Sequence, residues 1–375
     1  MMSTRTSKVR GPQLRVTLIC LEWPNKEHSG GVAHYAYRVA AAIAPRVALT
    51  IVTMEGATPL AGATMVYLPR STSRLDRYYR LPLRVRSVLR QLDADVVHSF
   101  GDDWALARSR TPLVRTFLGS SLAEARSSQG LRRLNHYVLA LTELISVRRA
   151  KFRIAIGPDS FAQFQCHRLM PPVVQVPPAE TVIKSAEPSV IFIGSFKGRK
   201  RGYLVEKAVE QAIVELGRPV RLTVIGPGSD QSSWSPSTAH VSGASDQQVS
   251  NLIAESWVLM APSLYEGFGI PVFEAMSLRV PAVVSLNPGS RYLRGLVEGA
   301  NRSPGGTDKS EEHGPVTIVV DDDDLLPVLK YHLQQGPRLP NSQAAVLDLA
   351  VERLLSDASP DRLVTEVYEK LAASS

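Results

Sequence analysis

The chain has 375 residues, of which 44% are hydrophobic and 21% are charged, and its formal net charge is +8. Such a length accommodates two domains that each bury a core, and the composition excludes an intrinsically disordered chain. No apolar run approaches the roughly 20 residues of a membrane-spanning helix. The positive charge favours anionic partners, either nucleotide diphosphates or acidic lipids, whereas an aromatic content of 6% argues against nucleic acid binding by base stacking.

The two cysteines, Cys20 and Cys166, lie far apart in the chain, and neither has neighbours of a metal-binding type. They predict free thiols in a reducing compartment, and therefore a cytoplasmic location. The basic residues 1–13 lead into a strand pattern and lack the apolar core of a signal peptide, so we expect a flexible leader there.

The first predicted unit is a strand at residues 14–20, then a glycine loop, then a helix at residues 32–44. Gly30 and Gly31 stand directly before that helix. Glycines let the backbone approach a ligand closely, and a helix N-terminus attracts anions, so the loop is a candidate phosphate site. A glycine pair by itself is only a weak indication of such a site.

Four further strands are predicted, at residues 47–52, 64–68, 95–98 and 113–116. They alternate with helical stretches, which indicates parallel strands joined by crossover helices. His98 ends one of these strands, and Leu118 and Gly119 follow another.

The most basic segment is Arg70–Arg90, which carries seven arginines and a single acid, Asp76, with apolar residues between them. We favour a solvated helix as its structure. The alternative is a basic amphipathic segment that lies on an anionic membrane surface. Residues 131–149 follow a helical apolar spacing, and there we expect a helix that faces the core.

The second half of the chain begins after predicted strands at residues 152–156 and 173–176 and a proline-containing linker at residues 181–188. A strand at residues 189–194 ends at Gly194, and Arg199 and Lys200 follow it at a predicted helix start. Cations oppose the helix dipole at that position, so a bound anion is the better explanation for them. Another strand ends at Gly226, and the acidic residues 321–324 are expected to cap a helix, not to bind a metal.

The clearest indication of function comes from residues 262–276, which follow a predicted buried strand at residues 257–261. Gly267, Phe268 and Gly269 form a loop, and a helix begins around a proline directly after it. Glu266 and Glu274 bracket the loop. A phosphate fits such a loop, and ionised carboxylates are strong acceptors for sugar hydroxyls. The stretch therefore predicts a site for a nucleotide sugar.

This pattern, two glutamates separated by seven residues with Gly-Phe-Gly and a proline between them, resembles the donor-site motif of the retaining GT-B glycosyltransferases of family 4, also called glycosyl transferases group 1. The similarity continues to residue 285, with Arg279 standing where the family usually has glycine. The resemblance implies an α/β GT-B fold, in which two Rossmann-like domains with parallel sheets face a central cleft. Its parts would be an acceptor-side domain at residues 14–180, a nucleotide-sugar domain at 189–355 and a helix at 356–375 that crosses back to the first domain.

The resemblance also implies a role for each matching residue. Glu266 would bind hydroxyls of the donor sugar, Glu274 the ribose hydroxyls, and Arg199 with Lys200 the diphosphate. Further donor contacts are expected from Gly30, Gly31, Gly194, Gly226, Gly267, Phe268 and Gly269, and sugar or acceptor contacts from His98, Leu118 and Gly119. Family members often have histidine at the position of Leu118, so this substitution bears on catalytic competence.

The expected activity is transfer of a hexosyl group, with retention, from a nucleoside diphosphate sugar to a hydroxyl acceptor in the biosynthesis of a polysaccharide, a lipid-linked glycan or a small glycoside. UDP- or GDP-sugar would be the co-substrate, with no cofactor and no metal. Two alternatives remain open. One is a degenerate relative that acts as a binding partner, and the other is a nucleotide-sugar epimerase or phosphorylase of the same fold. A nicotinamide dehydrogenase is disfavoured because the full Gly-x-Gly-x-x-Gly fingerprint is missing.

Overall fold

A computed structural model describes residues 13–25, 30–71, 73, 75–106, 111–126, 130–172, 183–301, 313–357 and 359–374. Most of the expected leader, the expected strand at 173–176 and the start of the expected linker lie outside these residues. In the described part of the chain, every helix is too short or too polar to cross a membrane.

The first half of the chain forms a seven-stranded sheet in which all neighbouring strands are parallel. The strands are β1 (Arg15–Ile19), β2 (Ala48–Met54), β3 (Ala63–Leu68), β4 (Val96–Ser99), β5 (Leu113–Phe117), β6 (Phe152–Ala155) and β7 (Arg168–Leu169). Their order is β3-β2-β1-β4-β5-β6-β7, so the winding direction reverses between β1 and β4. Ligand sites of doubly wound sheets lie at this reversal.

The second half forms a six-stranded parallel sheet with the order β10-β9-β8-β11-β12-β13. Its strands are β8 (Ser189–Ile193), β9 (Arg221–Ile225), β10 (Ala239–Val241), β11 (Val258–Ala261), β12 (Ala282–Ser285) and β13 (Val316–Val319). Strands β8 and β12 are buried along almost their whole length, because helices cover both faces of a parallel sheet. The predicted fold class of two Rossmann-like domains is confirmed.

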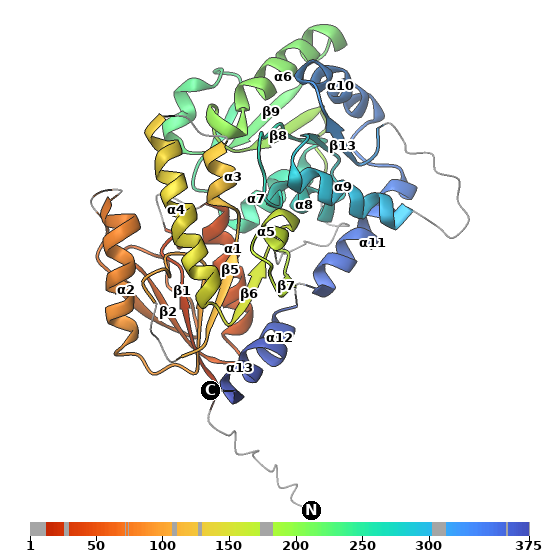
Figure 1. Cartoon of the computed structure of the whole chain (residues 1–375). Helices are drawn as coiled ribbons and strands as arrows, with labels where there is room; N and C mark the ends of the chain where they lie inside the picture. The colour runs from red at the N-terminus through yellow and green to blue at the C-terminus, as the bar shows by residue number, and fades with distance from the viewer. Residues whose placement is uncertain are drawn as a thin grey trace, which may run out of the picture.

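Helices connect the strands of both sheets (Figure 1). In the first domain they are α1 (Gly31–Ile43), η1 (Asp76–Arg80), α2 (Leu81–Leu89), α3 (Ser121–Arg126), α4 (Gly130–Arg149) and α5 (Pro158–Gln163). In the second they are η3 (Gly198–Lys200), α6 (Gly202–Leu216), η4 (Gly228–Ser233), α7 (Asp246–Glu255), α8 (Ile270–Ser277), α9 (Pro288–Asn301), η5 (Asp322–Asp324) and α10 (Leu325–Gln335). In η5, the side chain of Asp321 caps the amide of Asp323, as expected for the acidic run.

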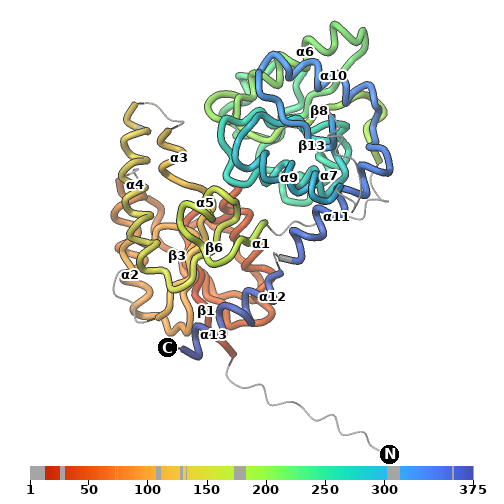
Figure 2. The backbone as a smooth tube through the Cα atoms, turned by 45° about the vertical axis from the view of Figure 1, so that its right-hand side comes forward, coloured from red at the N-terminus to blue at the C-terminus, as the bar shows by residue number. Residues whose placement is uncertain are grey.

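The C-terminal segment joins the two domains. Helix α11 (Asn341–Asp357) packs against α8 and α9 of the second domain. The chain then returns to the first domain through α12 (Pro360–Leu363), η6 (Val364–Tyr368) and α13 (Glu369–Ala373), as Figure 2 shows. There Asp361 forms an ion pair of 2.6 Å with Arg46, and Glu366 pairs with Arg168. These contacts tie the end of the chain to the first domain.

Helix α4 departs from the sequence-based expectation. Its apolar residues were predicted to face the core, but Leu131, Leu134 and Leu141 are 86%, 62% and 62% exposed. The opposite, polar face of α4 packs on the domain, where Ser146 donates to Asp103 after β4 and Glu143 accepts from Ser121 at the start of α3. The prediction was wrong because a helical period reveals an apolar face but not what lies against it.

Candidate active site

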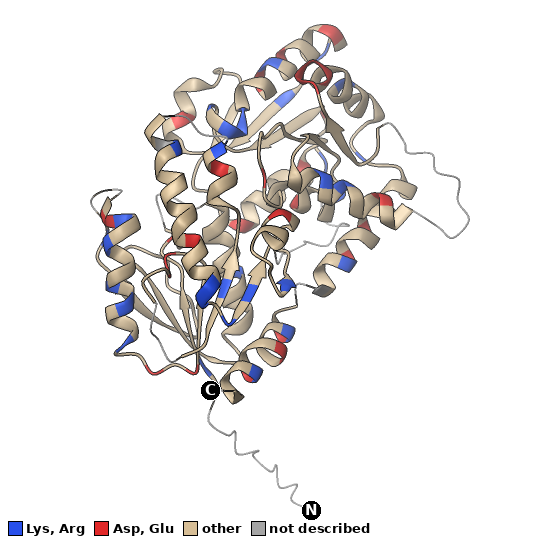
Figure 3. Cartoon of the chain, viewed as in Figure 1, with Lys and Arg blue, Asp and Glu red and all other residues tan. Residues whose placement is uncertain are grey.

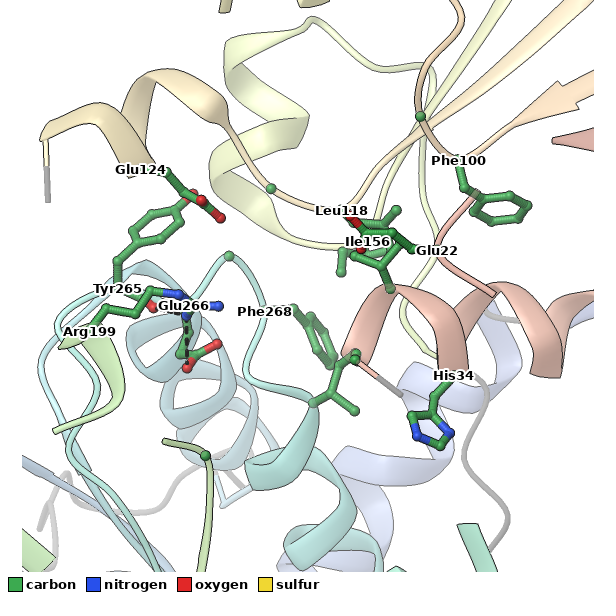
Figure 4. Close-up of a pocket in the computed structure, with 18 of the residues that line it drawn as sticks. Glu22, His34, Phe100, Leu118, Glu124, Ile156, Arg199, Tyr265, Glu266 and Phe268 are labelled. Atoms are coloured by element: carbon green, nitrogen blue, oxygen red, sulfur yellow. Dashed lines mark hydrogen bonds and ion pairs between the residues drawn. The ribbon is translucent and has the colours of Figure 1, made fainter. Parts of the chain in front are cut away.

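A cleft of about 1170 Å³ lies between the two domains. Its walls are the loops at the carboxyl ends of β1, β4, β5, β8, β9 and β11, together with the N-termini of α1 and α8. Figure 4 shows Glu266 and Arg199 on the second domain, with Leu118 and Ile156 across from them on the first. Both sheets therefore direct their ligand-binding edges into one space.

The glycine loop of the second domain leads directly into α8. Gly269 has a φ of 91° and is the N-cap of this helix, and Pro271 occupies its first turn. The glycine is needed because other residues rarely adopt that left-handed conformation. Gly31, at the start of α1, lies beside α8, because an added Cβ would be in ordinary van der Waals contact with Ile270 Cδ1 at 3.7 Å. Two helix N-termini, one from each domain, thus converge on the cleft and create a positive potential there.

Phe268 contributes to the site through its backbone. Its ring is 1% exposed and packs edge-on against Phe273, at 5.5 Å between ring centroids. The aromatic side chain therefore anchors the loop in the core, and the peptide groups of Gly267, Phe268 and Gly269 line the cleft.

Glu266 is the carboxylate at the centre of the second-domain wall. Its Oε1 lies 2.5 Å from Lys200 Nζ and 3.4 Å from Arg199 Nη1. Burial by itself would raise the pKa of Glu266, but the charges of Lys200 and Arg199 outweigh it and lower the pKa below the ordinary value. Glu266 is consequently ionised at neutral pH, and the two cations stand beside it in the cleft.

The basic residues in and around η3 divide into two groups. Arg199 and Lys200 line the cleft, with Arg199 also donating to the backbone oxygen of Tyr265 at 2.8 Å. Arg201 instead bonds to Pro262 O, Ser285 Oγ and Asp322, and it does not line the cleft. Arg201 therefore serves the structure of the loop. The two predicted diphosphate ligands line the cleft, and so does Lys197, the N-cap of η3.

Glu274 lies on the cleft but is already engaged by the first domain. Its Oε1 accepts a hydrogen bond of 2.9 Å from Arg38 Nη2, and Arg38 Nε donates to Asp246 Oδ2 at 2.8 Å. His34 also pairs with Asp246. Burial raises the pKa of Glu274, and the charge of Arg38 opposes that rise. Burial would also raise the pKa of Asp246, but bonds from His34 and Arg38 lower it to about 2.

These four residues, His34, Arg38, Asp246 and Glu274, form an ion cluster that spans both domains. We call it the interdomain cluster. All four line the cleft. The predicted role of Glu274 as the ribose ligand stays a prediction, because this carboxylate holds Arg38 in the present structure.

The other predicted glycines also lie in the cleft wall. Gly194 and Gly226 pack so tightly that a Cβ on Gly226 would lie 2.6 Å from Gly194 O. Gly30 has open space around it, with no heavy atom within 4 Å of an added Cβ. Glycine at 226 therefore allows the two loops to pack closely, and the open space at Gly30 leaves its backbone accessible to a ligand.

Leu118 and Gly119 line the cleft beside the glycine loop, whereas His98 does not. A Cβ on Gly267 would lie 3.3 Å from Leu118 O, so the loops of the two domains are in contact at this point. His98 is 1% exposed, and its ring nitrogens lie 2.5 Å from Tyr368 Oη and 2.7 Å from Thr116 Oγ1. The expected sugar or acceptor contact of His98 has no support in this geometry, because the C-terminal segment encloses the ring.

Sequence reasoning missed several charged residues of the cleft. Arg38 and Asp246 are two of them, and Arg115 on the first domain is a third. Arg38 and Glu274 are 236 positions apart, so no local spacing could pair them. Asp102 and Asp103, in contrast, directly follow a predicted strand, at the position where α/β ligand sites lie, and both line the cleft.

Two family models match the sequence, one in each domain. The model for Glycosyltransferase Family 4 matches residues 29–179, and the model for Glycosyl transferases group 1 matches residues 187–305. No curated protein matches the sequence.

Solved structures share the fold over nearly the whole chain. Sucrose-phosphate synthase from Thermosynechococcus elongatus has a TM-score of 0.71 at 15% identity, covering 97% of this chain and 100% of its own. WaaG, a glycosyltransferase involved in lipopolysaccharide biosynthesis, has a TM-score of 0.66 at 19% identity, covering 96% of this chain and 99% of its own. Anabaena HepE in complex with UDP-glucose has a TM-score of 0.64 at 12% identity, covering 96% and 100%. The matched family models and this shared architecture show that the chain belongs to the group 1 glycosyltransferases of the GT-B fold.

Proposed function

We propose that the protein transfers a hexosyl group from a nucleoside diphosphate sugar to an acceptor hydroxyl, with retention at the anomeric carbon. The observation that carries the proposal is the trio of Glu266, Lys200 and Arg199 beside the N-terminus of α8. It combines a hydroxyl acceptor with two cations and a helix dipole, which is what a sugar diphosphate requires.

The arrangement supports departure of the leaving group. When the bond between the anomeric carbon and the diphosphate oxygen breaks, negative charge grows on the diphosphate. Lys200, Arg199 and the amides at the start of α8 are positioned in advance to stabilise that charge. Since the cations also hold Glu266, they can shift toward the diphosphate and release the carboxylate to the sugar hydroxyls.

The acceptor oxygen then bonds to the anomeric carbon, and its proton passes to the oxygen of the departing diphosphate on the same face. The products are the nucleoside diphosphate and the new glycoside, so the step balances without a protein nucleophile. Glu266 binds and orients the donor in this scheme.

UDP is the proposed nucleotide, because Anabaena HepE, which has the same fold, is known in complex with UDP-glucose. The first test is thermal unfolding in the presence of UDP, GDP, ADP, dTDP or NAD. A ligand at about 100 times its dissociation constant adds about 2.7 kcal/mol to the free energy of unfolding, and this raises the melting temperature. A shift of the melting temperature with UDP supports the proposal. A shift with another nucleoside diphosphate would change the proposed base of the donor and leave the proposed reaction as it is. If no nucleotide shifts the transition, the degenerate relative with Leu118 becomes the better explanation.

The second test removes the charge of Glu266. The Glu266→Gln variant should lose turnover on the order of a hundredfold, because its amide no longer offers an ionised acceptor to the sugar. The matched control is Glu298→Gln, since Glu298 is an exposed carboxylate of α9 that pairs with Arg294. Full turnover in Glu266→Gln would remove this residue from the mechanism.

We also propose peripheral contact with an anionic membrane through η1, α2 and α4. These elements lie side by side (Figures 1 and 2), and Tyr79 Oη approaches Asn135 Oδ1 at 3.5 Å. Their outer surface combines exposed apolar residues with arginines, and Figure 3 shows the arginines along α2. The exposed members are Leu83, Leu131, Leu134, Leu141, Leu144, Arg80, Arg84, Arg90, Arg133 and Arg148.

The acids of these elements do not face outward, since Asp76 is buried and Glu143 bonds to Ser121. Positive charge at both ends of the apolar stripe disfavours pairing of α4 with a second copy and favours an anionic bilayer. Vesicles of phosphatidylglycerol should bind the protein at least tenfold better than phosphatidylcholine vesicles. The double variant Leu134→Gln with Leu141→Gln should abolish that difference, and Ile183→Gln with Val214→Gln, exposed residues outside this surface, should preserve it. Equal binding to both vesicles would contradict the contact.

A further inference from the structure

The first-domain half of the cleft contains a second group of buried charged residues, centred on Asp103 and Arg115. Asp103 follows β4 and is 1% exposed, and Arg115 lies on β5 with a side chain that is 9% exposed. Both line the cleft. Asp103 Oδ1 accepts a hydrogen bond of 2.8 Å from Ser146 of α4, and it lies 3.7 Å from Arg115 Nε.

Several polar atoms of this pair lack a hydrogen-bond partner among the residues that the structure describes. They are Asp103 Oδ2, Arg115 Nε and Arg115 Nη1. A buried polar atom without a partner is costly, so such atoms in a folded protein point to a missing ligand or solvent molecule. Here an acceptor oxygen stands beside two donor nitrogens. A hydroxyl group needs that combination, because it donates one hydrogen bond and accepts others.

The charges around this pair restrict the ligand further. Five carboxylates line this part of the cleft, and they are Glu22, Asp102, Asp103, Glu124 and Glu143. Two arginines oppose them, Arg77 and Arg115. Arg77 is already paired with Asp102 at 2.8 Å and with Glu22 at 3.5 Å.

The remaining arginine, Arg115, lies between carboxylates of its own domain. Burial raises the pKa of Glu143, and the charge of Arg115 counteracts part of that rise. Arg115 is thus already offsetting negative charge on Asp103 and Glu143. A phosphate or carboxylate on the acceptor would add another anion to a region with excess negative charge, which is unfavourable where water is displaced.

We propose that Asp103 and Arg115 bind the acceptor, and that the acceptor is a sugar or similar polyol with no phosphate or carboxylate at this position. A protonated amine is compatible with the site, since the surrounding charge is negative. This inference rests on the proposed transferase function and specifies the substrate class of the acceptor half of the cleft.

The test compares acceptor probes that differ in charge, using the full chain loaded with the sugar conjugate of the nucleotide identified by thermal unfolding. The probes are methyl glucoside, glucosamine, glucose 6-phosphate and glucuronic acid, and release of the nucleoside diphosphate is the readout. Methyl glucoside or glucosamine should stimulate release at least tenfold more than the two anionic probes. A preference for an anionic probe, or no stimulation by either neutral or amino probe, would overturn the inference.

Variants separate this inference from the proposed function. Asp103→Asn should raise the acceptor KM about tenfold or more. Asp103→Asn and Glu143→Gln, which each remove a negative charge, should both improve the relative use of glucose 6-phosphate. Nucleotide affinity should remain unchanged in both. Glu143 is only half-buried, so its variant remains informative if Asp103→Asn folds poorly. The control is Asp93→Asn, which makes the same substitution at an exposed aspartate that pairs with Arg15. It should leave the acceptor KM and the probe preference unchanged.

Unchanged acceptor KM and unchanged probe preference in both variants would overturn the assignment of these residues. Loss of nucleotide binding in the unaltered protein would instead refute the transferase proposal itself. The two failures are therefore distinguishable.

Discussion

Arg279 occupies a position at which the backbone favours glycine. Its φ is 54°, directly after the C-cap Leu278 of α8. The amide of Val280 donates to Ala275 O at 2.8 Å and that of Arg279 to Met276 O at 3.1 Å, which is the Schellman pattern of helix termination. This geometry gives the physical reason why glycine is usual at this position in the family that the sequence resembles. The arginine also pairs with Asp348 at 2.8 Å.

The strain at Arg279 leads to a prediction for two variants. Arg279→Gly should be more stable than Arg279→Ala by about 1 kcal/mol, because both lose the exposed ion pair and only glycine relieves the left-handed backbone. Urea denaturation of the two variants measures the difference. Equal stabilities would show that the chain accommodates alanine at this φ without cost.

A second prediction at this scale concerns His98 and acid stability. Burial, with a smaller contribution from the charge of Arg115, lowers the pKa of His98 from 6.5 to about 3. Because the folded-state pKa lies below the unfolded one, the folded state is fully favoured above pH 6.5 and loses stability as the pH falls toward 3. The loss is up to about 1.4 kcal/mol per pH unit.

Denaturation at pH 7, 6 and 5 should show this decline, and His98→Gln should make it shallower because glutamine does not titrate. His332, whose pKa is lowered to about 4 by burial, should account for part of the residual slope. An unchanged slope in His98→Gln would contradict the assignment to His98.

At the scale of elements, the contact between α5 and the glycine loop joins the two domains at the active site. Gly157 precedes α5, and an added Cβ would lie only 1.8 Å from Gly267 O. Tyr265 Oη also donates to Asp159 Oδ2 at 3.1 Å across the same boundary. Backbone approach this close leaves no space for a side chain, so α5 determines where the glycine loop lies.

Gly157→Ala should therefore displace the glycine loop and weaken nucleotide binding about tenfold or more. The added methyl group would clash with the backbone of the loop, which cannot move aside as a flexible side chain can. Titration calorimetry with the nucleotide identified by thermal unfolding measures this. Gly299→Ala is the control, because a Cβ there meets nothing within 4 Å and lies in α9, where alanine stabilises a helix by roughly 1 kcal/mol. Normal nucleotide affinity in Gly157→Ala would show that the loop adapts.

For the whole molecule, the interdomain cluster is a largely buried electrostatic link between the two domains. Arg38 has a side chain that is 7% exposed, and it contacts Asp246 and Glu274 from α1. If the domains separate, water solvates all of these charges. The cluster therefore favours the arrangement seen here only because its ion pairs are well placed, which offsets the cost of removing the charges from water.

Replacing Arg38 should therefore act on domain closure. Arg38→Gln leaves Glu274 without its cation, at a cost of about 3 kcal/mol if the cleft remains closed, so the domains should open instead. Small-angle X-ray scattering should report a larger radius of gyration than for the unaltered protein. Arg46→Gln is the control, since its pair with Asp361 is half-exposed and worth less than about 1 kcal/mol. An unchanged radius in Arg38→Gln, with unchanged stability, would mean that the cluster does not contribute to closure.

Much of the architecture could be predicted because its signals are local. The buried runs that became β1, β8 and β12 are continuous in sequence, and Glu266, the Gly267–Gly269 loop and Glu274 lie within a single strand-loop-helix unit. Short-range sterics and helix geometry are enough to place such residues together, whatever the rest of the chain does.

Contacts between distant segments could not be predicted in that way. Tyr368 encloses His98 across 270 positions, and Arg38 reaches Glu274 across 236. Helix α4 has the apolar period of a core helix, yet no described segment covers its apolar face. Local pattern in this chain therefore decided its elements and its donor motif. Only the packed molecule decided which charges are paired and which faces are buried, because burial and pairing depend on what a distant segment places there.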